Sequence, residues 1–246
     1  MNVWVRMTAL AVTGIAMTTA AHAQDAQPTG FYGELNVGVA HLNDANITYY
    51  DDGGTFGGSG AQDTFDGTFD FKSAATFGGK LGYDFGPVRT DLEITYARNK
   101  VQAFTINRVN GQAVTLSASD RADVCDYLEA DACGGSGNTF QIDGSRARQL
   151  NALVNLWADL PIGRFVPYAG GGLGIAGYEV DGEGKGKFAW QIGAGAAYHF
   201  SPAVAVTADY RHRQNGSTTI EYDNVSGVQL GKLKTDAFTL GLRAYF

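Results

Sequence analysis

Residues 190–213 read WQIGAGAAYHF, SPA and VAVTADYRHR in succession. On both sides of the SPA connection, apolar and polar residues alternate along the chain. In the first stretch, Trp190 and Ile192 fall on one face of an extended chain, and Gln191 and His199 fall on the other. This alternation predicts two antiparallel β-strands joined by a tight turn, each with one apolar and one polar face.

The same alternation recurs along much of the remaining chain. It is found in residues 31–42, 69–85, 88–100, 149–160, 165–178 and 238–246. Together with the two strands above, these stretches predict an all-β fold of eight antiparallel strands. Each can supply the roughly 10 residues that a tilted strand needs to cross a membrane, whereas soluble strands average about 5–6.

The connections between these stretches alternate in length without a break. Short connections at residues 86–87, 161–164 and 201–203 are interleaved with longer ones at 43–68, 101–145, 179–187 and 214–233. Barrels of the Gram-negative outer membrane have short periplasmic turns and long extracellular loops. We therefore predict an eight-stranded antiparallel up-and-down transmembrane β-barrel in that membrane, with both termini in the periplasm.

The polar face of the predicted strands carries acidic and basic residues in similar numbers. They form a predicted interior charge network: Glu34, Asp70, Lys72, Lys80, Arg89, Asp91, Glu93, Asp159, Asp209, Arg211 and Arg243. An eight-stranded barrel encloses a space just wide enough for side chains, so these charges can pair inside it. A soluble lipocalin-like barrel would instead place them on its outer surface. The charges alone leave both orientations open.

The aromatic residues favour the membrane barrel over the lipocalin-like one. With alternating strand directions, Phe85 and Tyr198 fall at the short-turn end, and Trp190 and Phe238 fall toward the long-connection end. Two aromatic girdles around an apolar band are typical of barrels that cross two membrane interfaces.

The first 23 residues predict a secretory signal peptide that is cleaved from the mature chain. Arg6 supplies the positive charge, residues 7–20 are mostly apolar or small, and Ala21-His22-Ala23 matches a cleavage site. The remaining residues, 24–246, form one predicted barrel domain.

Composition and cysteine content narrow the classes of function. A formal net charge of −7 gives no support to nucleic-acid binding. In an exported chain, Cys125 and Cys133 predict a disulfide. Because neither cysteine has a neighbouring histidine, we predict no metal site and no cofactor.

Two short motifs resemble those of known outer-membrane proteins. The segment Thr239-x-Gly241-x-x-Ala244-x-Phe246 resembles the terminal signal that the barrel assembly machinery recognises, although a residue larger than Ala244 is usual. Residues 165–174, FVPYAGGGLG, resemble a strand of the OmpA/OmpX-like small-barrel superfamily, within the porin family of outer-membrane β-barrels. The resemblance implies fold and location, because this family does not share one activity.

Some outer-membrane barrels are enzymes, so the outward histidines His41 and His212 need attention. Members of the lipid A deacylase family carry an outward His-x-Ser on one strand. In this sequence the corresponding triplet is His212-Arg213-Gln214, so the serine is missing. A Ser-His hydrolase needs a serine that reaches the imidazole. An oxidase would need a compact cluster of metal ligands, and none is evident in the sequence. We therefore expect no catalysis.

A set of basic residues shares the outward face at the long-connection ends of the predicted strands. It comprises Arg98, Lys100, Arg146, Arg148, His212 and Lys234. Arginine forks onto phosphate oxygens and lysine serves as a point charge. One hypothesis is a collar that binds lipopolysaccharide phosphates, and the alternative is ordinary solvated charge at strand ends.

The function expected from these features is that of a structural or interaction barrel. It would have a filled polar interior, outer-membrane lipids and lipopolysaccharide as its surroundings, and loops exposed to extracellular partners. The assembly machinery would be its partner during insertion. A narrow channel for small solutes and a lipid A-modifying enzyme are the alternatives.

Overall fold

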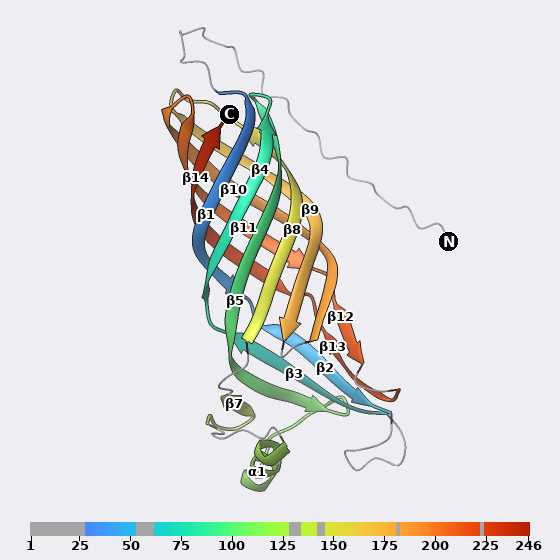
Figure 1. Ribbon diagram of the computed structural model, residues 1–246. Helices are drawn as coiled ribbons and strands as arrows, with labels where there is room; N and C mark the ends of the chain where they lie inside the picture. Colours follow the sequence, from blue (N-terminus) through green and yellow to red (C-terminus); the bar gives the residue numbers. More distant parts are fainter. Residues whose placement is uncertain (1–27, 53–61, 128–133, 142–145, 181–182, 222–223) are drawn as a thin grey trace, which may run out of the picture.

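A computed structural model describes residues 28–52, 62–127, 134–141, 146–180, 183–221 and 224–246 (Figure 1). The predicted signal peptide, residues 1–23, lies outside the described residues. In the described part of the chain, no helix has the length and apolar character needed to span a membrane.

The described residues form 14 β-strands, rather than the eight that we predicted, and one α-helix. A subset of eight strands closes into a ring: β1 (Gly30–Leu42), β4 (Ala74–Asp84), β5 (Val88–Val109), β8 (Arg146–Asp159), β9 (Phe165–Val180), β10 (Glu183–Ser201), β11 (Val204–Asn215) and β14 (Lys234–Tyr245). Each ring strand pairs antiparallel with the ring strands that precede and follow it along the chain, and β1 closes the ring against β14. The ring therefore has the predicted up-and-down order.

The other six strands lie at one end of the ring. They are β2 (Ala45–Asp51), β3 (Asp63–Phe71), β6 (Gln112–Ala113), β7 (Thr139–Gln141), β12 (Thr218–Glu221) and β13 (Ser226–Leu230). Together with the end of β5, they form a second sheet in the order β12-β13-β2-β3-β5, with β6 and β7 also paired to β5. Figure 1 shows this sheet beyond the ring, with α1 (Ala118–Tyr127) beyond the sheet. We call the sheet and α1 the extension.

In the extension, the structure differs from the prediction for one strand and three loops. Residues 69–85 are two strands, because the chain breaks at Lys72 and Ser73 between β3 and β4. The alternation in sequence continues across this break, but the backbone partner changes: β5 pairs with β4 up to Ala97 and with β3 from Val101 onward. The long connections therefore contain strands of their own.

The apolar face of the ring points outward. Leu35, Leu81 and Phe238 are 76%, 67% and 66% exposed, whereas the charged residues Glu34, Lys80 and Arg243 of the same strands are buried inside. A lipocalin-like barrel would have the opposite arrangement. A ring of exposed apolar side chains is the surface that lipid would cover.

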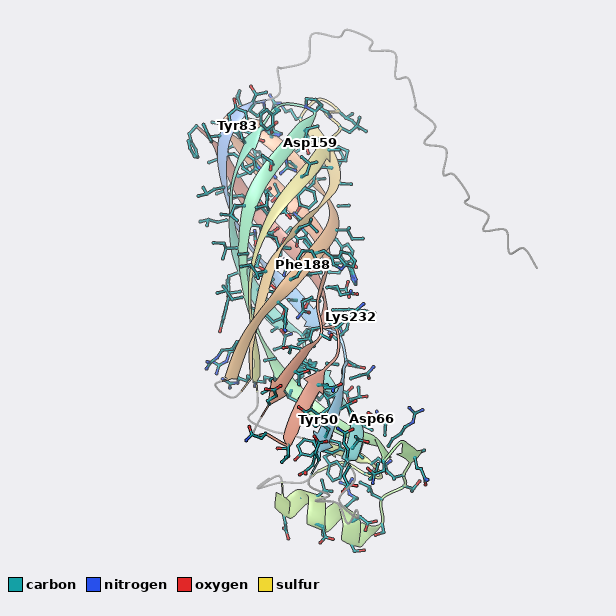
Figure 2. All side chains as sticks on the ribbon, turned by 90° about the vertical axis from the view of Figure 1, so that its right-hand side faces the viewer. Tyr50, Asp66, Tyr83, Asp159, Phe188 and Lys232 are labelled. Carbon is teal, nitrogen blue, oxygen red and sulfur yellow. The ribbon has the colours of Figure 1, made fainter. Side chains whose placement is uncertain are left out.

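Aromatic side chains gather toward the ends of this apolar surface. At the short-turn end, Tyr83 packs edge-on against Phe31 and is close to Phe85, with ring centroids 4.9 and 4.6 Å apart respectively. Near the extension, Tyr210 packs against Phe238 at 5.0 Å. Figure 2 shows Tyr83 and Asp159 near one end of the molecule and Tyr50 and Asp66 at the other.

The extension has its own apolar core, built from strand residues that face α1. Ile47, Phe104, Ile106 and Phe140 are buried there. Arg121 of α1 stacks on the Phe140 ring at 4.4 Å and donates to the backbone carbonyls of Gly137 and Thr139. These contacts tie the helix to the sheet.

Ser117 and Asp120 cap the start of α1. The Ser117 amide donates to the Asp120 carboxylate, and the Asp120 amide donates to Ser117 Oγ. The hydrogen bond from the Ser117 backbone holds the pKa of the Asp120 carboxyl below its usual range. Cys125 packs at the edge of the extension core, but Cys133 lies outside the described residues, so the disulfide stays a prediction.

Glycine permits close approach of β1 to β14 at Gly38. This residue faces the interior, and a Cβ atom here would overlap the Phe238 carbonyl and lie 2.7 Å from Thr239 Cα. We expect Gly38→Ala to lower the free energy of unfolding by about 1–3 kcal/mol, because the backbone of β14 must move. Urea unfolding in lipid vesicles measures this.

Gly33→Ala is the matched control on the same strand. A Cβ atom at Gly33 would meet Leu81 Cδ2 at an ordinary 3.6 Å. We expect this variant to unfold at nearly the same urea concentration as the native chain. Equal effects of the two substitutions would contradict the close approach.

Candidate functional site

The ring interior holds a layer of buried ion pairs centred on Glu34. Lys80 Nζ lies 2.5 Å from Glu34 Oε1 and 3.1 Å from Asp209 Oδ2. Arg243 Nε donates to Glu34 Oε2 at 2.9 Å. These four side chains come from β1, β4, β11 and β14, and they meet because alternate residues of each strand face inward.

A second group of bonds converges on Asp91 of β5. Its carboxylate accepts from Tyr32 Oη at 2.6 Å, Asn155 Nδ2 at 2.7 Å and Trp157 Nε1 at 3.0 Å. All three donors are neutral, so hydrogen bonds from neutral groups stabilise the negative charge of the Asp91 carboxylate. Nearby, Arg89 forks onto both carboxylate oxygens of Asp159, at 2.8 and 3.1 Å.

Arginine and aromatic side chains join the two groups into one network. Arg211 forms an ion pair with Asp209 at 3.0 Å and lies 4.2 Å from the centroid of the Trp157 ring. Tyr168 donates to Asp209, and Arg89 lies 4.5 Å from the Tyr168 ring centroid. Stacking of this kind stabilises guanidinium groups that have lost their hydration.

Neutral polar side chains fill the interior on the extension side of this network. Gln191 Nε2 donates to Glu93 Oε2 at 2.7 Å, and Arg213 donates to Gln191 Oε1 at 2.8 Å. Gln149 donates to Asn99 and accepts from Thr235, at 2.9 and 3.0 Å. These bonds span the ring between β5, β8, β10, β11 and β14.

A small cavity lies among these residues. Its walls include Glu93, Asn151, Arg211 and Arg213, and it has room for about one water molecule. Nitrogen atoms of the two arginines lie 3.9 Å from Glu93 oxygens, a separation that a bridging water can span. The cavity is too small to serve as a route for a solute.

An apolar cluster lies in the interior where the ring meets the extension. Its buried members are Leu42, Ala45, Phe71, Val101, Ala147, Leu153, Ala176, Ala189 and Leu233. They come from both the ring and the extension, so the break at Lys72 and Ser73 brings Phe71 into the mouth of the ring. We call this cluster the apolar plug.

The structure brings together most of the predicted interior charges but not all of them. Glu34, Lys80, Arg89, Asp91, Glu93, Asp159, Asp209, Arg211 and Arg243 lie inside the ring. Lys72 is exposed at the break between β3 and β4. Asp70 belongs to β3 of the extension and lies near Asp44. Burial and the neighbouring Asp44 carboxylate raise the pKa of Asp70. The strand break explains why both residues lie outside the network.

Sequence reasoning missed several residues of the interior. Arg213 has the same strand parity as Asp209 and Arg211, so its inward position could have been read from the alternation. Trp157 and Tyr168 also face inward, as the parity of their strands indicates. Their hydrogen bonds to Asp91 and Asp209 depend on register between distant strands, which the sequence does not show.

The predicted basic collar is divided into two separate groups. Arg98 and Lys100 of β5 lie directly opposite Arg148 and Arg146 of β8. His212 and Lys234 lie on β11 and β14, where His212 Nδ1 is 2.8 Å from Asp236 Oδ1. The structure therefore does not place the six residues in one continuous ring of positive charge.

The three described histidines have different surroundings. His41 Nδ1 lies 3.2 Å from Ser73 Oγ on the outer surface, and His199 is buried at the short-turn end. Among the residues that the structure describes, no group of three or more histidine, cysteine or acidic side chains is arranged to hold a metal ion.

The residues of the predicted assembly signal lie on or just after the last ring strand. Thr239, Gly241 and Ala244 belong to β14, and the amide of Phe246 donates to the Phe31 carbonyl at 3.0 Å. Phe246 is exposed at the short-turn end, on the same side as Phe31.

Solved structures with a similar fold are outer-membrane proteins. Outer membrane protein OprG from Pseudomonas aeruginosa is 13% identical, with a TM-score of 0.52, over 89% of this chain and 99% of that chain. Neisserial surface protein A is 13% identical, with a TM-score of 0.45, over 88% and 97% of the two chains. The outer membrane protease OmpT from Escherichia coli is 10% identical, with a TM-score of 0.43, over 93% and 100%.

The comparison with OprG supports the barrel fold alone, since the identity is low. No curated protein matches the chain in a sequence comparison. A family model does match, from residue 7 to residue 246, and it confirms the outer-membrane β-barrel family that the sequence motifs predicted. The closed ring, its outward apolar face and this match lead to one conclusion: the chain belongs to the family of the outer membrane protein β-barrel domain.

Proposed function

We propose that this protein is a structural or interaction barrel of the outer membrane, with a sealed interior and an extension that meets partners outside the cell. The interior is the observation that supports this proposal. Ion pairs fill one part of it, amide and hydroxyl groups fill the next, and the apolar plug closes the end beside the extension.

A narrow channel is the alternative function, and the packing of the interior weighs against it. A conducting path needs a continuous line of water through the ring. Lys80 instead contacts both Glu34 and Asp209 directly across the interior. An apolar constriction such as the plug also excludes water and ions.

A lipid A-modifying enzyme is the third function, and the outward histidines bear on it. Ser73 and His41 form a serine–histidine pair, but a hydrolase also needs a carboxylate that orients the imidazole. Asp236 lies opposite His41 on the β1–β14 ladder. Its carboxylate is instead hydrogen-bonded to His212, Tyr210 and Asn43. We therefore propose a protein without catalytic activity.

Orientation follows from the connections. Short turns join the ring strands at residues 85–87, 160–164 and 202–203, and the extension lies at the other end. Since outer-membrane barrels turn tightly in the periplasm, we propose that both termini are periplasmic and that the extension is extracellular. We further propose that Thr239, Gly241, Ala244 and Phe246 are recognised by the assembly machinery during insertion.

Conductance tests the sealed interior. We expect the full-length mature protein to show no unitary current steps in a planar lipid bilayer, because the charge network and the plug close the path in series. A faster-running unboiled band on a denaturing gel would establish that the same sample is folded. Reproducible current steps from the folded protein would support the channel instead.

Disrupting the apolar plug alone should not produce a current across the bilayer. In Leu42→Ser/Phe71→Ser the plug becomes polar, but the ion pairs of Glu34, Lys80 and Asp209 remain beneath it. We expect no current from this variant. Current that begins when only the plug is changed would show that the charge network does not close the ring.

The ion pairs should also govern stability. Lys80→Gln leaves Asp209 and Glu34 without their shared cation, so we expect a loss of about 3–5 kcal/mol in the free energy of unfolding. Lys72→Gln is the matched control, because Lys72 is exposed and should change stability by less than about 0.5 kcal/mol. Similar unfolding curves for the two variants would contradict the network.

Lipid A composition tests the absence of catalysis. We expect mass spectra of lipid A from cells that make the protein to match those from cells that lack it. Loss of an acyl chain that depends on Ser73 and His41 would overturn this expectation and support the enzyme.

A further inference from the structure

Basic side chains form a compact cluster on the outer surface of the ring. In the β5–β8 ladder, Arg98 lies opposite Arg148, and Lys100 lies opposite Arg146. All four occupy the end of the ring nearest the extension. Arg98, Lys100 and Arg148 are exposed and Arg146 is half-buried. We call these four residues the basic cluster.

Two pairs of like charges lie directly across a ladder here. Like charges in opposed positions destabilise a β-ladder unless an anion lies between or above them. Arg148 lies opposite Glu179 in the register of the β8–β9 ladder. Among the described residues, no acidic side chain forms an ion pair with Arg98, Lys100 or Arg146 in the structure.

The surface directly beside the basic cluster is apolar. The next opposed pair on the outer face of the ladder is Tyr96 with Leu150, and these side chains are 40% and 57% exposed. Further toward the short-turn end, Leu92 and Val154 are an exposed opposed pair. On the outer face of β5 and β8, the end nearest the extension is therefore positively charged, and the surface from there toward the short-turn end is apolar.

The ligand that fits this surface has an anionic head and apolar chains. Its phosphate would meet the guanidinium groups, which can fork onto phosphate oxygens. Its acyl chains would lie along Leu150 and Val154 on the lipid-facing side. A soluble anion would use only the upper part of the surface.

We propose that the basic cluster binds the phosphate of an outer-leaflet glycolipid, with Arg98, Lys100 and Arg146 as its main contacts. The proposal rests on the extracellular orientation of the extension given above. It narrows the collar inferred from the sequence: His212 is paired with Asp236, and Lys234 lies opposite Gln214 on the β11–β14 ladder. Neither residue belongs to this site.

The test compares two variants of equal charge change in the full-length mature protein, folded in a neutral detergent. Arg98→Gln/Lys100→Gln/Arg146→Gln removes three charges from the basic cluster. Arg108→Gln/Lys232→Gln/Lys234→Gln removes three exposed charges that lie outside the basic cluster. Native mass spectrometry measures the binding of purified lipid A with its phosphates and of the same lipid after enzymatic dephosphorylation.

We expect the cluster variant to bind phosphorylated lipid A at least about tenfold more weakly than the native chain, since several charge-assisted bonds are lost. The control variant should stay within about twofold, because only diffuse attraction changes. Dephosphorylated lipid should bind weakly to all three proteins. A comparable loss in both variants, or equal binding of the dephosphorylated lipid, would overturn the proposal.

Inorganic phosphate distinguishes a lipid site from a general anion site. At a concentration equal to that of the lipid, it should not displace lipid A, because it lacks the apolar chains. Displacement would overturn the assignment to a lipid. Heat-modified gel mobility shows that each variant is folded, and bilayer conductance reports on the sealed interior separately, so failure of one proposal is distinguishable from failure of the other.

Discussion

Glu34 lies between two cations, Lys80 and Arg243, in an interior that water barely enters. Transfer of charged groups out of water costs several kcal/mol for each ion, and only close partners and hydrogen bonds offset that cost. The ring can therefore close only when strands far apart in sequence deliver opposite charges to the same level. Glu34 and Arg243 are brought together by the closing pair of strands, β1 and β14. The pairing of β1 with β14 therefore closes the ring and also brings these two opposite charges together.

Under the proposed function, this constraint leaves recognition to the outside of the molecule. The charged side chains at the centre of the interior are paired with one another, and the apolar plug lies between them and the extension. What remains available is the exposed apolar surface, the basic cluster on β5 and β8, and the sheet and helix of the extension. The extension is itself a packed unit, in which Arg121 fastens α1 to the sheet through Phe140 and backbone carbonyls. A rigid ring that carries an ordered extension is suited to presenting a surface.

The sequence predicted the ring well, because the two-residue alternation of a strand is a local property. It placed Glu34, Lys80 and Asp209 on the polar face correctly as inward-facing residues, but their contacts depend on strand register, which no single stretch contains. The break at Lys72 was missed, since the alternation continues through it and only the partner of β5 changes. The strands within the long connections were also missed, and these connections were predicted as loops. Trp157 and Tyr168 were missed as network members because their polar atoms occupy a small part of large apolar side chains.

The accessibility of Lys80 tests the sealed, charge-paired interior most directly. A small water-soluble amine reagent would be applied to the folded protein, and modification of each lysine would be followed by mass spectrometry. Lys72, Lys232 and Lys234 are exposed and should react readily, whereas Lys80 is 3% exposed and should react only after unfolding. Modification of Lys80 at the same rate as the exposed lysines would show that water and solutes reach the interior, and would contradict the account.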